Sequence, residues 1–391
     1  METIFTLGLA MLVGLLFNRI AKRIGLPNVT GYLVAGLLIG PSLLGIFNEQ
    51  AIEEATVITN VALGFIAFSI GGEFKLSNIR RLGKAVLIVT CCEALGAVFL
   101  VDVVLSALGF PPPLALTLGA IAAATAPAAT LMVVRQYNAH GPVTDILLTA
   151  VALDDTVGLI VFSISLSVVQ GISAGQAASL QSILLSPLKE IILSLVVGGA
   201  IGIALSLASR YFHSKSNRLC LVICSVLLGT ALADRWGLSA LLLCMANGAT
   251  MVNLREDSDK ILDVTDSWTP PLFLLFFVIS GAELNPKILP SVGLLGIAYL
   301  LARSAGKYLG AFAGGRLSKC NPNVQKYLGV ALLPQAGVAI GMSQIVITAL
   351  PAYGEKIRTV ALAATLVYEL VGPLMTKLAL TKAGEIEKKT A

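Results

Sequence analysis

Two adjacent carboxylates lie in the middle of a long apolar stretch of the sequence. Asp154 and Asp155 interrupt a run at about 143–169 that is otherwise long enough to cross a bilayer. An aspartate near the centre of a membrane helix costs on the order of 2.5 to 3.5 kcal/mol on insertion scales, so a neighbouring pair indicates a function. Because close carboxylates repel each other, the pair takes up either a proton or a metal cation. This chemistry suits the exchange of a cation for protons.

The composition is typical of polytopic membrane proteins. Of the 391 residues, 56% are hydrophobic and 13% are charged, whereas about 25% are charged in a typical soluble domain. The 27 Lys and Arg residues lie mostly at the ends of apolar segments, so the net charge of +5 does not indicate nucleic-acid binding. The six cysteines show no metal-binding spacing. We expect no cofactor and, since neither histidine has a visible nucleophile partner, no enzymatic activity.

The apolar segments predict an all-α polytopic membrane protein with about 13 transmembrane helices. The predicted spans lie at about 4–18, 28–47, 56–74, 85–108, 114–134, 143–169, 185–209, 218–236, 238–254, 268–284, 289–315, 327–350 and 357–378. Most basic residues follow odd-numbered spans or lie in the C-terminal tail, so the N-terminus is expected outside and the C-terminus in the cytoplasm. The sequence therefore predicts a multi-pass protein of the cell inner (plasma) membrane, surrounded by membrane lipid.

The two halves of the chain resemble each other at an offset of about 209 residues, which is typical of transporters. Segment 31–36 recurs loosely at 239–242, and segment 70–74 recurs at 279–284. The offset pairs the second span with the ninth, and an odd displacement reverses the direction across the membrane. We therefore expect two inverted repeats.

A proline interrupts the fifth and the twelfth spans near mid-membrane. The residues at these breaks are Thr125, Ala126, Pro127 and Thr130 in the fifth span and Pro334, Gln335 and Gly337 in the twelfth. The backbone groups that a proline frees can exist at that depth only where protein or a water-filled cavity satisfies them. Matched breaks beside two aspartates favour two discontinuous crossing helices over simple proline kinks. We expect the break residues to line the ion site.

A lysine lies at the same predicted depth as the aspartates. The helical rise places Asp154 roughly 17 Å and Lys307 roughly 14 Å from the cytoplasmic ends of their spans. A buried lysine at that level is expected to pair with one of the carboxylates. Glu93, Arg303 and Glu369 also fall inside spans. For these three, two alternatives stay open: an internal ion pair that orients helices, or a supporting role in the ion path.

Together these residues resemble the monovalent cation:proton antiporter superfamily, in particular the prokaryotic Na+/H+ antiporters of the NapA type. Further matches are segment 36–41 in the second span and Gly306 and Gly310 around Lys307 in the eleventh. The resemblance covers almost the whole chain. It implies that Asp155 binds either the cation or the proton, and that Asp154 pairs with Lys307 when the cation is absent.

The resemblance also implies a homodimer that exchanges Na+ or Li+ for protons by an elevator movement. A core at about 83–184 and 289–380 would move against a dimerisation panel at about 1–82 and 218–288, joined by a linker helix at about 185–217. Many relatives carry an Arg-Gly-Glu run after the twelfth-span proline, where this chain has Gln335-Ala336-Gly337. This departure leaves the ion preference open. Arg303, one helical turn before Lys307, is a second candidate partner for the two aspartates.

The main interpretation includes a role in pH homeostasis, and two other transport functions are alternatives to it. A K+/H+ antiporter of the same fold is the main alternative. Antiporters of that kind usually carry a cytosolic nucleotide-binding domain, for which the residues after Lys377 are too few. A cation channel would need several weak sites along a continuous pore. Two deep aspartates with a lysine counter-ion favour tight binding in competition with protons.

Overall fold

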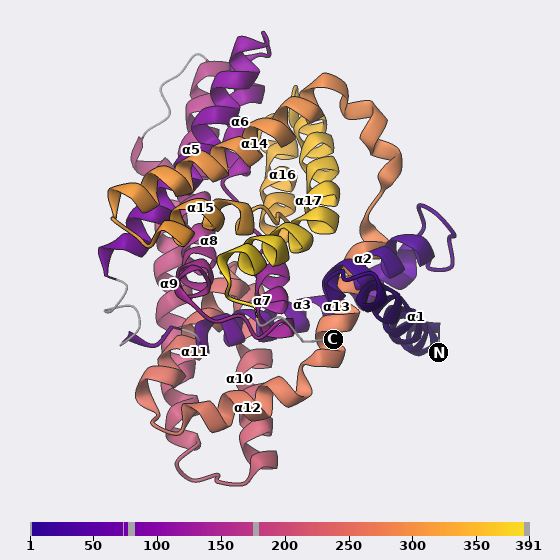
Figure 1. Ribbon diagram of the computed structural model, residues 1–391, viewed down its shortest axis with the longest axis vertical. Helices are drawn as coiled ribbons and strands as arrows, with labels where there is room; N and C mark the ends of the chain where they lie inside the picture. The colour runs from indigo at the N-terminus through magenta and orange to yellow at the C-terminus, as the bar shows by residue number, and fades with distance from the viewer. Residues whose placement is uncertain (1, 73, 77–82, 175–179, 387–391) are drawn as a thin grey trace. The chain divides into compact units, whose positions relative to one another are not determined.

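The computed structural model describes residues 2–72, 74–76, 83–174 and 180–386. The secondary structure assigned within these ranges is helical (Figure 1). Nine candidate spans in this part of the chain are long and apolar enough to cross a membrane, and shorter apolar helices occur at 28–39, 240–254 and 338–347. The prediction of an all-α polytopic membrane protein is confirmed. The number of about 13 spans stays a prediction.

The chain divides into two compact units. Unit 1 comprises 1–20, 31–81 and 188–283, and unit 2 comprises 21–30, 82–187 and 284–391. Each unit combines an early segment of the chain with a late one. The assignment of a dimerisation panel, a core and a linker to particular segments stays a prediction.

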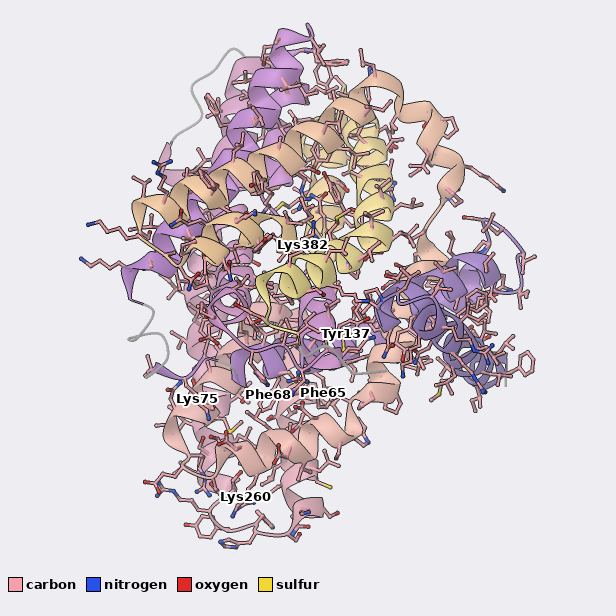
Figure 2. The ribbon with its side chains drawn as sticks, in the orientation of Figure 1. Phe65, Phe68, Lys75, Tyr137, Lys260 and Lys382 are labelled. Atoms are coloured by element: carbon pink, nitrogen blue, oxygen red, sulfur yellow. The ribbon has the colours of Figure 1, made fainter. Side chains whose placement is uncertain are left out.

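Unit 1 is held together by helices that cross at glycines. Unit 1 contains all or most of α1 (Glu2–Arg23), α2 (Asn28–Ile39), α3 (Glu49–Gly72), α9 (Leu180–Ala208), α10 (Lys215–Trp236), α11 (Ala240–Leu254), α12 (Ser258–Trp268) and α13 (Pro270–Glu283). Gly36 of α2 lies against the Val278 carbonyl of α13, so closely that a β-carbon at residue 36 would overlap it. On α3, Phe65 and Phe68 are fully buried (Figure 2), and the Phe65 ring lies 5.1 Å from that of Trp268. Glycines such as Gly36 let helix backbones pack closely, and this packing fixes how the helices cross in a membrane, where apolar burial alone does not.

Unit 2 contains every residue predicted for the ion site. Its helices are α5 (Lys84–Ala107), α6 (Pro112–Ala122), α7 (Pro127–Gln136), α8 (Pro142–Ala174), the 3-10 helix η1 (Pro286–Ile288), α14 (Leu289–Leu317), α15 (Pro322–Ala331), α16 (Gly337–Ala349) and α17 (Gly354–Ala383). Helices α16 and α17 run beside each other (Figure 1). A buried apolar cluster that includes Leu105, Leu118, Tyr299 and Met342 joins α5, α6, α14 and α16. This packing surrounds the ends of the broken helices.

Candidate ion-binding site

Two helices of unit 2 are interrupted at the positions that the prolines predicted. Helix α6 ends at Ala122 and α7 begins at Pro127, and α15 ends at Ala331 and α16 begins at Gly337. Pro127 occupies the first position of α7, where its fixed φ suits a helix start and its missing amide costs no hydrogen bond. The two breaks touch, because the Ala126 amide donates a hydrogen bond to the Pro334 carbonyl at 2.9 Å. The prediction of two discontinuous helices is confirmed.

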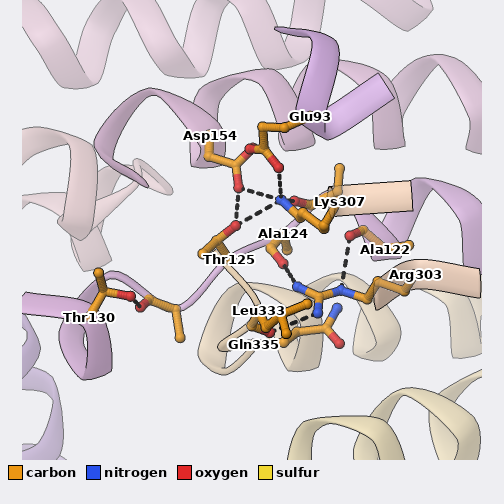
Figure 3. Close-up of polar contacts among 12 residues, drawn as sticks. Glu93, Ala122, Ala124, Thr125, Thr130, Asp154, Arg303, Lys307, Leu333 and Gln335 are labelled. Atoms are coloured by element: carbon orange, nitrogen blue, oxygen red, sulfur yellow. Dashed lines mark hydrogen bonds and ion pairs between the residues drawn. The ribbon is translucent and has the colours of Figure 1, made fainter. Parts of the chain in front are cut away.

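Arg303 of α14 occupies the junction between the two breaks (Figure 3). Its guanidinium donates to the carbonyls of Ala122 at 3.0 Å, Ala124 at 2.7 Å and Leu333 at 2.8 Å. These carbonyls lie at the C-terminal ends of α6 and α15, which carry the negative ends of the helix dipoles. The guanidinium also lies 4.3 Å from the centroid of the Tyr368 ring. The sequence leaves open an ion pair for Arg303 or a share in the role of Lys307. In this structure the Arg303 guanidinium instead neutralises the C-terminal ends of α6 and α15.

Lys307 lies one turn further along α14, in a cage of oxygen atoms. Its Nζ contacts the Ala123 carbonyl at 2.6 Å, Thr125 Oγ1 at 2.8 Å, Asp154 Oδ2 at 2.9 Å and Glu93 Oε2 at 2.7 Å. The Thr125 hydroxyl also donates a hydrogen bond to Asp154 Oδ2. The charged groups of Glu93, Asp154 and Lys307 are fully buried. The oxygen cage satisfies the ammonium in a region without bulk water.

A close crossing of α5 with α14 brings Glu93 and Lys307 together. A β-carbon at Gly306 would lie 2.6 Å from the Gly96 carbonyl oxygen and 2.7 Å from the Ala97 Cα. A β-carbon at Gly310 would lie 2.8 Å from the Glu93 Cα. Only glycine allows this approach of two backbones, and the crossing places the acid against the lysine.

The carboxylates of Glu93 and Asp154 lie next to each other above the Lys307 ammonium (Figure 3). Asp154 Oδ1 and both carboxylate oxygens of Glu93 accept no hydrogen bond from the part of the chain that the structure describes, and Glu93 Oε2 is in ion-pair contact with Lys307. Carboxylate and hydroxyl oxygens are hard ligands of the kind that alkali and alkaline-earth cations prefer. Oxygens of Asp154, together with Thr125, could therefore hold a small cation if the lysine withdrew.

Other residues predicted for the site take different positions. Thr130 lies in the first turn of α7, away from the lysine, and its hydroxyl donates to the Ala126 carbonyl at 3.1 Å (Figure 3). Gln335 is buried at the second break, where Nε2 donates to the Ile121 carbonyl at 3.0 Å and contacts the Tyr299 hydroxyl at 3.1 Å. Glu369 is buried on α17. The side chain of Asp155 lies outside the described residues, so its predicted role stays a prediction.

The contact between Glu93 and Lys307 was not predicted as a pair from the sequence. The signal that could have found it is the spacing of glycines on α14, with Gly306, Gly310 and Gly314 four residues apart and Lys307 directly after the first. Such spacing is typical of a close crossing between membrane helices. Gly96 of α5 lies three residues after Glu93 and completes the crossing.

The fold and the site together define a class of protein, a polytopic membrane transporter with two discontinuous helices that meet beside a buried cluster of acids and lysine. The sequence profile of the family described as "Sodium/hydrogen exchanger, transmembrane" matches residues 7–382. The chain therefore belongs to the sodium/hydrogen exchanger family.

Curated relatives and a solved structure agree with this membership. The chain is 25% identical over 349 residues to a Na(+)/H(+) antiporter of Enterococcus hirae, covering 88% of this chain and 90% of the relative. It is 22% identical over 389 residues to the K(+)/H(+) antiporter subunit KhtU of Bacillus subtilis, covering 96% and 93%. The fold matches a structure of the sodium proton antiporter MjNhaP1 from Methanocaldococcus jannaschii with a TM-score of 0.71 at 22% identity, over 98% of this chain and 96% of that one.

Proposed function

We propose that this protein is a secondary active antiporter that exchanges Na+ or Li+ for protons across the plasma membrane by an elevator-type movement. The observation that carries the proposal is the position of the Lys307 ammonium, which contacts Asp154 and Thr125 between two broken helices. A buried ammonium that contacts several oxygens marks a site whose oxygens could also coordinate a dehydrated cation. Membership of the sodium/hydrogen exchanger family supports the reaction.

In the proposed cycle, a cation entering the site displaces Lys307 from Asp154 and the proton from Asp155. The freed carboxylate oxygens then bind the cation, while the break between α6 and α7 supplies the Thr125 hydroxyl. Protons and cations compete for the same carboxylates, so each drives the release of the other. The broken helices allow carbonyls and hydroxyls to face a buried ion without leaving a lipid-exposed gap in hydrogen bonding.

The proposal includes a homodimer with its N-terminus outside and its C-terminus in the cytoplasm. The distribution of basic residues supports this orientation. In the dimer, the predicted panel would stay fixed while the core carries the ion. The transported ions are substrates and not resident cofactors.

A K+/H+ antiporter is a second candidate function, which the likeness to the K(+)/H(+) antiporter subunit KhtU over 93% of that protein favours. The experiment that separates the candidates uses purified protein in liposomes with an imposed pH gradient and an internal pH dye. Na+, Li+, K+ and, as a control, choline are added in turn. We expect Na+ and Li+ to dissipate the gradient. A response to K+ alone would establish the alternative, and no response to any of the three metal ions would contradict antiport.

A further inference from the structure

Lys307 has two acidic partners, although a cation site of the proposed kind requires only one. Its Nζ lies 2.7 Å from Glu93 Oε2 and 2.9 Å from Asp154 Oδ2. The two acids come from different helices, Glu93 from α5 and Asp154 from α8. All three charged side chains are fully buried.

The two pairs differ in how firmly their helices are joined. The backbones of α5 and α14 are in contact at Gly96, Gly306 and Gly310, on both sides of Glu93 and Lys307. The two backbones pack directly against each other at these glycines, so the acid and the lysine belong to one closely packed helix pair. Asp154 is held to the lysine by side chains alone, namely its own carboxylate and the Thr125 hydroxyl. Asp154 is therefore the partner that can be released.

A buried ammonium that loses its only acid is left as an uncompensated charge, which carries a large desolvation cost. That cost would oppose any cation that binds to Asp154 in place of the lysine. Cation binding to Asp154 neutralises the negative charge beside Glu93, and Glu93, whose Oε2 lies 2.7 Å from Nζ, is then the anionic partner of the ammonium. The cation then competes for Asp154 against a lysine that has another acid to bind.

We propose that Glu93 is a positioning residue that retains Lys307 when Asp154 takes up the cation, and that it thereby sets the apparent affinity for the cation. The inference rests on the proposed function, since it assigns Glu93 a part in the same site. Glu93 acts on the cation through Lys307 and not as a ligand. Without Glu93, the lysine binds Asp154 more tightly and excludes the cation.

The test is a double-mutant cycle over Glu93→Gln, Lys307→Gln and the double variant. Two readouts are used: the apparent KM for Na+ in the liposome assay, and the Na+ concentration that half-saturates the rise in Tm of purified protein. Glu93→Asp keeps the charge and serves as the conservative rescue. Thr90→Val, a nearly isosteric change of a buried residue one turn before Glu93, is the matched control for packing on α5.

We expect Glu93→Gln to raise the apparent KM and the half-saturating concentration by at least about tenfold, because the buried ammonium loses one partner of an ion pair. Glu93→Asp should recover most of this loss, and Thr90→Val should match the parent. In the Lys307→Gln background, removing Glu93 should change either value by less than about twofold.

An equal loss of affinity in both backgrounds would overturn the proposal, because Glu93 would then act on the cation directly. Parental affinity in Glu93→Gln would overturn it as well. If Glu93→Gln does not fold, Glu93→Asp decides, because the shorter acid recovers most but not all of the affinity: a residual loss of affinity with Lys307 that disappears in the Lys307→Gln background supports the role, and the same fold-loss in both backgrounds opposes it. A parent that binds Na+ but moves no protons would refute the proposed function while the binding cycle still tests Glu93.

Discussion

Gly306→Ala tests whether the close crossing of α5 and α14 is what positions the charged cluster. A β-carbon on residue 306 would lie 2.6 Å from the Gly96 carbonyl oxygen, whereas ordinary van der Waals contact begins at 3.4 Å. The atoms that this β-carbon would meet are backbone atoms of Gly96 and Ala97, so no flexible side chain can rotate away to relieve the overlap. The two helices must therefore separate by about 0.8 Å to relieve the clash.

The separation carries directly to the ion pair beside it. The distance from Glu93 Oε2 to Lys307 Nζ would rise from 2.7 Å to about 3.5 Å, which weakens the ion pair. With an effective dielectric constant of about 20, the Coulomb attraction falls by about 1.4 kcal/mol, which corresponds to a factor of about ten. Overpacking adds a loss of about 1–3 kcal/mol in the free energy of unfolding.

We therefore expect Gly306→Ala to lower the Tm of the purified protein and to raise the apparent KM for Na+ in liposomes by about tenfold. The matched control is Gly341→Ala on α16, where a β-carbon would meet no atom within 4 Å. That variant should be as stable as the parent or slightly more so, because alanine is the better helix former. If Gly306→Ala and Gly341→Ala behaved alike in both assays, the crossing would not be the element that positions the cluster.

Two further predictions concern interactions at the ends of helices. Glu385 accepts hydrogen bonds of 2.7 Å from the Thr144 amide and hydroxyl at the N-terminus of α8. Glu385→Ala should therefore lower the free energy of unfolding, measured by thermal unfolding in detergent, by about 1.5–3 kcal/mol, and Thr144→Val should lower it by less. Equal stability of the parent and Glu385→Ala would contradict this cap. Burial raises the pKa of Asp257, but the hydrogen bonds and charges of Arg255 and Arg218 outweigh it and hold the pKa below its usual value. The contribution of the Asp257 carboxylate to stability is therefore present above the unfolded-state pKa of about 3.9 and is lost as the pH falls through the folded-state value. The Tm difference between the parent and Asp257→Asn should be largest near neutral pH and vanish in acid. A Tm difference that grew in acid would refute the ion pairs of Asp257 with Arg218 and Arg255 as its cause.

The two breaks and the depth of the charges could be predicted from the sequence because both depend on local rules. Pro127 and Pro334 each remove a backbone donor from a helix, and their matching positions in the two halves of the chain favour breaks over simple kinks. The rise of an α-helix alone places Asp154 and Lys307 at similar depths, and the structure has them in contact at 2.9 Å.

The partners of the remaining charges depend on helix crossings that a single sequence does not specify. Arg303 and Lys307 lie one turn apart on α14, yet one contacts carbonyls at the helix ends and the other contacts two acids. Which of them meets Glu93 is decided by where Gly306 and Gly310 lie against α5. Likewise, the cap that Glu385 provides for α8 comes from a residue more than 240 positions away. Sequence spacing gives no sign of such a contact.

The central claim is that the adjacent carboxylates of α8 exchange a cation for protons. The most direct measurement is Na+-driven proton movement in liposomes with the parent and with Asp155→Asn, at equal protein content and after both have eluted as folded protein from size exclusion. The amide keeps the shape of the side chain but holds neither the proton nor the charge that a cation requires. We predict that Na+ dissipates the pH gradient with the parent and has no effect beyond empty liposomes with Asp155→Asn. Parental rates from the folded variant would contradict the claim.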